Sequence, residues 1–408
     1  MKTYLFSIFV RFFLAFSGFL VFILTAYLYG AEGRGVIGYG TSLFAIFGSL
    51  LSFNLGRGFL AETVQDGEKK RQLIGSFLTL NFIFGMTAIL AGLLYWYFSS
   101  TGREMLSQRQ VLLFSVISVF YIWTANGNFF FSSFLKTTLQ EIIILSVRSL
   151  LVVFLGALVL LKNHNLDLFI GWYAAIIFIG VVVENIFLLK ISQGKLLKKI
   201  DFAVFWQILD KTYIHHIDNL AFNIFPLVLT VICAAYISKA DVGRVNFAIQ
   251  IINMVFLLAL TANIRLMAYV SDTGFRARIS QYKKLFIFTM LASAAAIIVI
   301  YFGLNISLTR LHFRQFEGVG ELFLISSMAI PGYVFYQFLT PIWIELKKEK
   351  TLAAWHVLNF LVCLLWTPLI LKNYQTNGVM IIFGFFYVGI FLIQSGMFFK
   401  QFILKPHV

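Results

Sequence analysis

Several ionisable and strongly polar residues lie inside long apolar segments of the sequence, where charge is costly. The basic members are Arg11, Arg57, Arg148, Lys211 and Arg265, and the others are Glu184, His215, Asp218 and Asn219. A charge at the centre of a bilayer costs about 2.5 to 3.5 kcal/mol on insertion scales, so these groups should face protein or water. The basic excess predicts a cavity that attracts anions, and the planar fork of arginine suits phosphate. We therefore expect the five basic residues to bind a diphosphate group.

The remaining polar residues allow more than one interpretation. Glu184 and Arg148 lie on consecutive apolar segments joined by a short turn, so a structural ion pair is one explanation of Glu184. Lys211, His215 and Asp218 recur at i, i+4 and i+7 and share a helix face. A histidine beside Asp218 in a hydrated cavity suits proton coupling, because imidazole titrates near neutral pH. Hydrogen-bonded residues lining a vestibule, Asn219 among them, are the structural alternative.

Three of the arginines also have a structural explanation, and a metal site at the paired histidines has little support. Arg11, Arg57 and Arg265 lie near the ends of apolar segments, so they are also placed to extend their side chains to the head-group region. The adjacent His215 and His216 point about 100° apart on a helix, and no third ligand follows at a suitable spacing. We expect no metal site and no other cofactor.

The composition defines the elements that must hold these residues. The chain has 408 residues, of which 60% are hydrophobic and 12% are charged, and its net charge is +15. Its mean hydropathy is +0.89. Soluble proteins carry roughly 25% charged residues, so the chain is predicted to be an all-α integral membrane protein.

Runs of about 20 apolar residues predict twelve transmembrane helices. They lie near Phe6 to Tyr29, Val36 to Leu55, Leu73 to Phe98, Val111 to Phe134, Ile142 to Leu161, Leu168 to Leu189, Tyr213 to Ile237, Val245 to Met267, Leu285 to Leu304, Leu322 to Ile344, Ala353 to Leu371 and Val379 to Phe399. The N-terminus and even-numbered connections hold about twice as many Lys and Arg as the odd ones, which places both termini in the cytoplasm. The charge thus reports membrane orientation, and nucleic-acid binding has no support.

The longest hydrophilic connection divides the chain near its centre. We predict a six-helix bundle over residues 1–190, a cytoplasmic linker over residues 191–212 and a second six-helix bundle over residues 213–408. An even number of helices per half gives both halves the same orientation in the membrane.

Four segments of the sequence occur together in an arrangement that resembles a known family. They are AEGRGVIGYG (Ala31 to Gly40), interpreted as an outer turn, LGRGFLAE (Leu55 to Glu62) at the end of the second helix, IDNLAF (Ile217 to Phe222) and the turn ADVGRVNFA (Ala240 to Ala248). The pattern is similar to that of Wzx-type O-antigen and polysaccharide flippases of the multidrug/oligosaccharidyl-lipid/polysaccharide exporter superfamily. Relatives often carry a basic residue after the acid of the seventh helix, where this chain has Asn219.

The resemblance implies a V-shaped exporter of twelve helices in a bacterial inner membrane. Its cargo would be an O-antigen or capsule repeat unit on undecaprenyl diphosphate, moved from the cytoplasmic to the periplasmic leaflet by alternating access without a chemical reaction. Proton or sodium coupling and contact with O-antigen polymerase machinery remain open.

Other functions are less well supported by the residues. A multidrug or cation antiporter of the same superfamily would need intramembrane acids, and only Glu184 is available in the first half. A membrane glycosyltransferase, ligase or polymerase would need reactive carboxylates or a metal outside the bilayer. A scaffold would have no use for so many intramembrane charges. We therefore expect a transporter rather than an enzyme.

Overall fold

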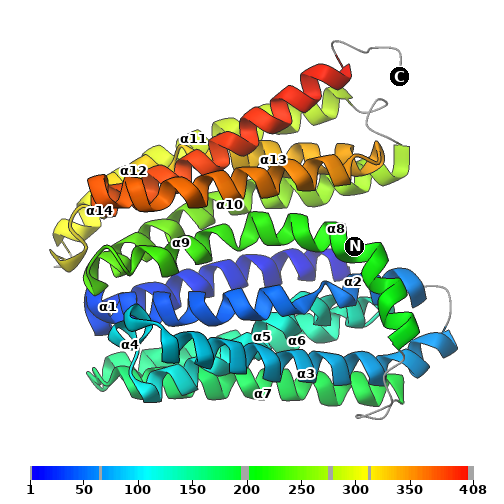
Figure 1. Ribbon diagram of the computed structural model, residues 1–408, viewed down its shortest axis with the longest axis horizontal. Coiled ribbons are helices and arrows are strands. Elements are labelled where there is room, and N and C mark those ends of the chain that lie inside the picture. The colour runs from blue at the N-terminus through cyan, green and yellow to red at the C-terminus, as the bar shows by residue number, and fades with distance from the viewer. Residues whose placement is uncertain (1, 64–66, 194–201, 274–278, 311–313, 403–408) are drawn as a thin grey trace. The chain divides into compact units, whose positions relative to one another are not determined.

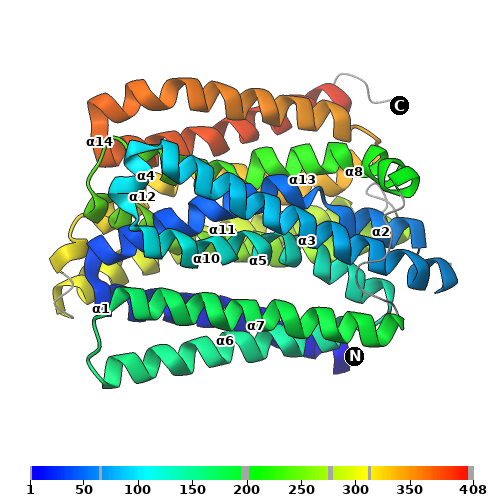
Figure 2. The same cartoon turned by 60° about the horizontal axis from the view of Figure 1, so that its bottom comes forward.

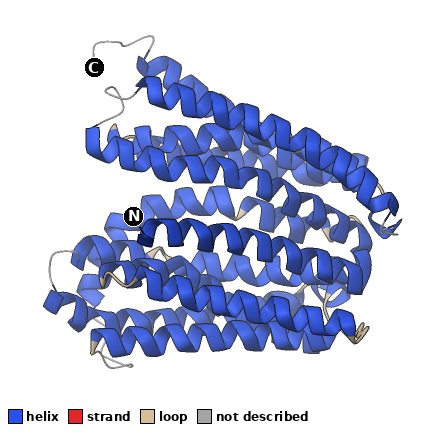
Figure 3. Cartoon of the chain, turned by 180° about the vertical axis from the view of Figure 1, so that it is seen from behind, coloured by secondary structure: helices blue, strands red, loops and turns tan. Residues whose placement is uncertain are grey.

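The computed structural model describes residues 2–63, 67–193, 202–273, 279–310 and 314–402, and these residues form helices joined by short connections (Figure 3). The chain divides into two compact units, Met1–His216 and Ile217–Val408. The boundary falls within one helix, α8. Each unit is described by itself.

The first unit is a bundle assembled around α5, which packs against α1, α2, α3, α6 and α7. Figures 1 and 2 show α6 and α7 as neighbouring long helices. The helices are α1 (Lys2–Ser52), α2 (Leu55–Thr63), α3 (Gly67–Phe98), α4 (Ser100–Met105), α5 (Gln108–Ser133), α6 (Thr137–Leu160), α7 (Leu166–Ser192) and the beginning of α8 (Phe202–Asn223).

The second unit is built around α10, α13 and α14, which pack against one another. Besides the end of α8, its elements are α9 (Phe225–Cys233), α10 (Lys239–Thr273), α11 (Ile279–Arg310), the short 3₁₀ helix η2 (Arg314–Phe316), α12 (Val319–Ser326), α13 (Ala329–Glu345) and α14 (Glu349–Phe402).

The helices identify a multi-pass membrane protein. Within the described residues, eight helices are long and apolar enough to cross a bilayer, or up to ten if each bent pair is one span. The bent pairs are α8 with α9, at 43°, and the segment Arg314–Ser326 with α13, at 49°. Pro226 lies in the first turn of α9, where a missing N–H is tolerated. The predicted number of twelve crossings is not established by these counts.

The two turns expected at residues 31–40 and 240–248 lie just before these segments. Residues 31–40 are helical within α1, and the interruption lies at Gly30, whose φ of 64° and ψ of −166° are accessible to glycine. Residues 240–248 likewise form the beginning of α10. Glycine is common in turns, but some glycines of α1 serve helix packing instead.

Two glycines of α1 show this packing role. A Cβ built on Gly40 would lie 2.4 Å from the ring of Phe114, and one on Gly48 would lie 2.6 Å from the carbonyl oxygen of Ser118. Both neighbours belong to α5. Small residues allow helices to approach closely in membranes, where apolar burial alone gives little reason to associate. The glycines therefore fix how α1 lies against the central helix of the first unit.

The core of the first unit is rich in aromatic residues. Phe59, Phe77 and Phe130 are fully buried and form mutual edge-to-face contacts with ring centroids 5.2 to 6.3 Å apart. Ile208 of α8 belongs to the same apolar cluster, and its side chain packs directly against Gly58. This cluster anchors the beginning of α8 and α2, the helix that carries Arg57.

Candidate functional site

A cavity of about 310 Å³ in the first unit contains Arg148 and Glu184 among its lining residues. It lies among α1, α5, α6 and α7, and its walls are mostly apolar. Arg148 lies 11 residues after Thr137, or about 17 Å along the axis at 1.5 Å per residue. Tyr121 of α5 lines the same cavity. A cation therefore lines a cavity far from the end of its helix.

Glu184 is buried in the same cavity, with 6% of its surface exposed. Its immediate neighbours are Gln140 and Trp123, which carry N–H donors, and Gly127, where an added Cβ would lie 3.4 Å from Oε2 of the carboxyl group. Both Arg148 and Glu184 are described, and no ion pair joins them. The two residues line the same cavity, and the ion pair that was one explanation of Glu184 is not formed between them.

Arg57 lies where α2 follows α1 across a break. Phe53 and Asn54 have positive φ values of 48° and 49°, and the backbone N–H of Arg57 donates to the carbonyl of Asn54 at 3.1 Å. The side chain is half-buried and has interactions of its own. Arg57 thus lies in the first turn of α2 and is not among the residues that line the Arg148 cavity.

The break before Arg57 is held by a buried amide of α5. Asn126 accepts a hydrogen bond from the N–H of Gly56 at 2.8 Å and donates to the carbonyl of Ser52 at 3.1 Å and to Asn81 Oδ1 at 3.0 Å. One side chain therefore joins α1, α2, α3 and α5. It satisfies backbone groups that the interruption of the helix leaves without helical partners.

The side chains of Arg11, Lys211 and Arg265 lie outside the described residues. Their positions in α1, α8 and α10 are known, but the structure does not test whether they line a common cavity. The binding role of all five basic residues remains a prediction.

The second unit contains a polar cluster centred on Asp218. Nδ1 of His356 lies 2.6 Å from Oδ1 of Asp218, and the Tyr336 hydroxyl lies 3.4 Å from Oδ2. His356 is fully buried, whereas the Asp218 side chain is 15% exposed. The cluster joins α8, α13 and α14. Nε2 of His356 is buried and has no hydrogen-bond partner among the described residues.

Aromatic rings enclose this cluster. The Tyr336 ring stacks on Phe222 with centroids 3.7 Å apart and lies 5.5 Å from the His356 ring. Such surroundings lower the local dielectric constant and strengthen the interaction between Asp218 and His356 when both are charged. The arrangement can hold a proton between a carboxylate and an imidazole.

The sequence interpretation chose a different histidine as the neighbour of Asp218. It singled out His215 because it shares a helix face with Asp218, whereas the structure gives Asp218 a partner from α14. The signal that could have identified His356 was its presence in a predicted transmembrane segment, where any ionisable residue suggests function. Tyr336 offered no such signal.

The other polar residues of α8 have partners outside the Asp218 cluster. His216 is buried, and its Nε2 lies 3.2 Å from the Leu50 carbonyl of α1. The Asn223 amide donates to Oδ1 of Asn219, which is exposed. His215 is half-buried and has an interaction of its own. No group of three or more metal-ligating side chains occurs in the described part of the chain.

Arg34 is a buried cation that the sequence interpretation assigned to an outer connection. Only 5% of it is exposed, its guanidinium carbon lies 3.9 Å from the centroid of the Phe22 ring, and Nη1 donates to Thr25 at 3.0 Å. These contacts join the two segments of α1 on either side of Gly30. A cation over an aromatic face is stabilised by the ring quadrupole, so Arg34 has a structural role at this break.

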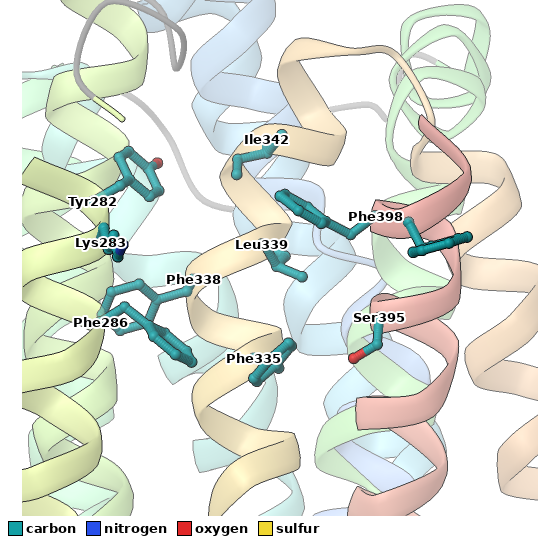
Figure 4. A pocket seen from close by; sticks show the side chains of 10 residues that line it. Tyr282, Lys283, Phe286, Phe335, Phe338, Leu339, Ile342, Ser395 and Phe398 are labelled. Atoms are coloured by element: carbon teal, nitrogen blue, oxygen red, sulfur yellow. The ribbon is translucent and has the colours of Figure 1, made fainter. Parts of the chain in front are cut away.

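An apolar groove of about 350 Å³ lies among α11, α13 and α14 of the second unit (Figure 4). Figure 4 shows Phe286, Phe335 and Phe338 around it, with Lys283 on α11 and Ser395 on α14. The groove therefore suits a hydrocarbon chain better than a polar ligand.

Comparison with known proteins gives a result only at the level of structure. No protein-family model matches the sequence, and no curated protein matches it. Among solved structures, the lipid II flippase MurJ in an inward closed conformation has a TM-score of 0.71 at 14% identity, covering 96% of this chain and 87% of MurJ. An inward-facing multidrug resistance transporter of the MATE family, from the MOP superfamily, has a TM-score of 0.67 at 14% identity, with 93% of each chain covered. A MOP superfamily transporter from Pyrococcus furiosus has a TM-score of 0.57 at 12% identity, covering 95% of this chain and 92% of that one.

The chain has the fold shared by these transporter structures. At these identities the likeness establishes the fold and not the cargo. The predicted exporter architecture agrees with this fold, and the assignment to Wzx-type flippases is consistent with the fold but not specific to it.

Proposed function

We propose that this protein is a lipid-linked oligosaccharide flippase of a bacterial inner membrane. Its cargo would be an O-antigen or capsule repeat unit on undecaprenyl diphosphate, moved from the cytoplasmic to the periplasmic leaflet without a chemical reaction. Twelve crossings follow if α1 and α14, which are interrupted at Gly30 and Gln375, each cross twice and each bent pair crosses once. Both termini then lie in the cytoplasm.

The proposal depends on one observation: Arg148 lines a cavity in a protein that has a transporter fold. The side chain lies far along α6, lines a cavity of about 310 Å³ and has no ion pair with Glu184 there. Arg148 is half-buried, and a guanidinium inside a membrane-crossing helix is costly unless it meets water or an anion. Diphosphate at the inner membrane surface is such an anion, and a guanidinium donates two hydrogen bonds to it.

The proposed mechanism is alternating access. Arg57 and Arg148, with Arg11, Lys211 and Arg265, would attract the diphosphate, while the isoprenoid tail remains in the bilayer. Exposure of the cargo to the other leaflet requires a change between two states, each stabilised by differential contacts. Glu184, His215, Asp218 and Asn219 remain proposed lining or ion-coupling residues.

We place ion coupling at Asp218 and His356. An imidazole and a carboxylate in contact share a proton, and their net charge changes when the proton leaves. Tyr336 provides a hydroxyl beside the same carboxylate. A coupled proton would give release of an anionic cargo a driving force. Sodium coupling is the competing assignment, since carboxylate oxygens are also its ligands.

A multidrug antiporter is the second candidate function, because MATE transporters share the fold. Glu184 is the observation that favours it, since a buried carboxylate in a cavity suits a cationic drug. Arg148 lines the same cavity and opposes a cation there. The two charges offset each other in this cavity, so the preference for an anionic cargo depends on the other four basic residues.

The test combines deletion of the gene with complementation by matched variants. Deletion should make lipid-linked oligosaccharide accumulate on the inner leaflet and remove the surface polysaccharide. Arg148→Gln should lower surface polysaccharide at least tenfold at normal protein abundance, because loss of a charge-assisted hydrogen-bond pair costs about 1.5 to 3 kcal/mol per bond. Lys136→Gln removes an exposed charge near the beginning of the same helix and should leave export unchanged.

Three results would contradict the proposal. One is normal polysaccharide export after deletion, and another is increased drug sensitivity without accumulation of lipid-linked oligosaccharide, which would indicate the antiporter. The third is full activity of both Arg148→Ala and Arg265→Ala, which would show that these cations do not hold the diphosphate.

A further inference from the structure

The second unit contains another cavity, of about 610 Å³, at one end of its helices. It is formed by the end of α13, the first two turns of α14 and the last three turns of α14. None of the residues of the Asp218 cluster lines it. By the predicted orientation this end of the unit faces the cytoplasm.

Two lysines line the cavity, and the turn after α13 fixes one of them. Lys347 has a φ of 54°, the N–H of Lys347 donates to the Ile344 carbonyl at 3.0 Å, and the N–H of Lys348 donates to the Trp343 carbonyl at 2.9 Å. These bonds are those of a Schellman motif, which sets the direction of the chain after a helix. The Lys348 ammonium donates to Gln401 Oε1 on the last turn of α14. Its charge is therefore held beside Lys400, the second basic residue of the lining.

The cavity also has donors and aromatic surfaces suited to a membrane interface. The Thr351 hydroxyl and the Trp355 ring lie one turn apart on α14 and are exposed. Trp343 is fully buried and is fixed by a hydrogen bond from its Nε1 to Gln394 at 2.9 Å. Tryptophan is enriched at the head-group level of bilayers. Glu349, the acidic residue of the first turn of α14, is not part of the lining.

The remaining lining is apolar and leaves an open space. Leu392, Ile393, Gly396 and Met397 lie on one face of α14 and line the cavity. A Cβ built on Gly396 would meet no atom within 4 Å. The glycine therefore deepens the cavity, and a larger side chain there would fill it without colliding with the protein.

The apolar groove of Figure 4 lies beside the same part of α14 and provides a contrast. It is lined by Ser395, Phe398 and Phe399 of that helix, and Lys283 is its basic residue. That groove offers space for a hydrocarbon chain, whereas the larger cavity combines two ammonium groups, a hydroxyl and an apolar wall. This combination matches a phosphate head group with its acyl chains attached.

We propose that the larger cavity binds one anionic phospholipid of the surrounding bilayer. The phosphate lies between Lys348 and Lys400, with the Thr351 hydroxyl as a further donor, and an acyl chain follows Leu392 and Met397 along α14. Basic pockets between transmembrane helices at the cytoplasmic side bind anionic head groups. The site does not depend on the cargo of the transporter.

The test uses the purified full-length protein and native mass spectrometry with phosphatidylglycerol, and with phosphatidylcholine as the zwitterionic control. We expect one tightly retained phosphatidylglycerol and weaker phosphatidylcholine binding. The double variant Lys348→Gln/Lys400→Gln should weaken phosphatidylglycerol binding about 25-fold, since each lysine near an anionic lipid surface contributes about fivefold. Its control, Lys347→Gln/Lys350→Gln, removes two exposed charges from the same connection without touching the lining.

A second pair of variants tests the cavity independently of charge. Gly396→Leu should abolish the tightly bound lipid by filling the cavity. Gly303→Leu is the matched control on α11, because a Cβ there also meets no atom within 4 Å, and it should leave binding unchanged.

Equal retention of the two phospholipids would overturn the proposal. The same holds if either control variant lost as much phosphatidylglycerol binding as the variant that it is matched to. Preferential binding of undecaprenyl diphosphate over phosphatidylglycerol, lost in Gly396→Leu, would also overturn it and would make this cavity a cargo site.

Discussion

At the scale of single residues, the structure separates side chains that share a cavity from side chains that share only a sequence pattern. Arg148 and Glu184 were expected to be close, and they line one cavity. His215 and Asp218 were expected to be close because they share a helix face, but the structure gives Asp218 the imidazole of His356, 138 residues further along the chain. Helical periodicity predicts neighbours on one helix and gives no information on partners from another.

The Asp218 and His356 contact gives a residue-scale prediction. Removing one partner leaves the other buried and uncompensated, so Asp218→Asn and His356→Gln should each lower both stability and transport. The double variant should be less destabilised than the sum of the singles, with a coupling free energy of about 1 to 3 kcal/mol in thermal or denaturant unfolding.

The control for this cycle is Asn373→Ala, because Asn373 is exposed and its amide donates to the Leu369 carbonyl of its own helix, α14. It should leave stability and transport unchanged. Strictly additive effects of the two substitutions would show that the contact contributes nothing to the folded state.

At the scale of elements, the apolar runs predicted where helices lie and two of the places where they break. Gly30 lies between the predicted helices that end at Tyr29 and begin at Val36, and Gln375 lies between those that end at Leu371 and begin at Val379. The bends inside predicted spans, such as that between α8 and α9, were not predicted by these runs. Leu73 to Phe98 corresponds to α3, and Val111 to Phe134 corresponds to α5 within a few residues. The segments Ala31 to Gly40 and Ala240 to Ala248, which were expected to be turns, are helical, and the turns lie just before them. A glycine in sequence suggests either a turn or a close helix contact, and the choice depends on the neighbouring helix, which one sequence does not reveal.

The break between α1 and α2 gives an element-scale prediction. Asn126→Leu removes three hydrogen bonds to buried groups around this break, so it should lower the free energy of unfolding by about 2 to 4 kcal/mol. The loss should appear as a lower melting temperature of the purified protein.

Asn128 supplies the matched control on the same helix. It is exposed, so Asn128→Leu should leave the melting temperature nearly unchanged. If both variants melted alike, the Asn126 amide would have no special part in holding the break.

At the scale of the whole molecule, composition and the spacing of apolar runs were sufficient to predict an all-helical multi-pass membrane protein, because each crossing has a required length and polarity. The exporter architecture was implied only by the resemblance of four segments to a known family. Arg57 and Arg148 are described, whereas the side chains of Arg11, Lys211 and Arg265 are not. The cargo depends on a few side chains in a shared fold, and for that reason neither hydropathy nor fold identifies it.

The central claim is that this protein moves a lipid with a diphosphate head group across the bilayer. The most direct measurement uses the purified protein in vesicles with fluorescent undecaprenyl-diphosphate oligosaccharide, and follows how much label becomes inaccessible to a membrane-impermeant quencher. We predict transfer at least tenfold faster than in protein-free vesicles, slowed at least tenfold by Arg148→Gln and absent for labelled phosphatidylcholine. Equal transfer of both lipids, or no transfer above protein-free vesicles, would contradict the account.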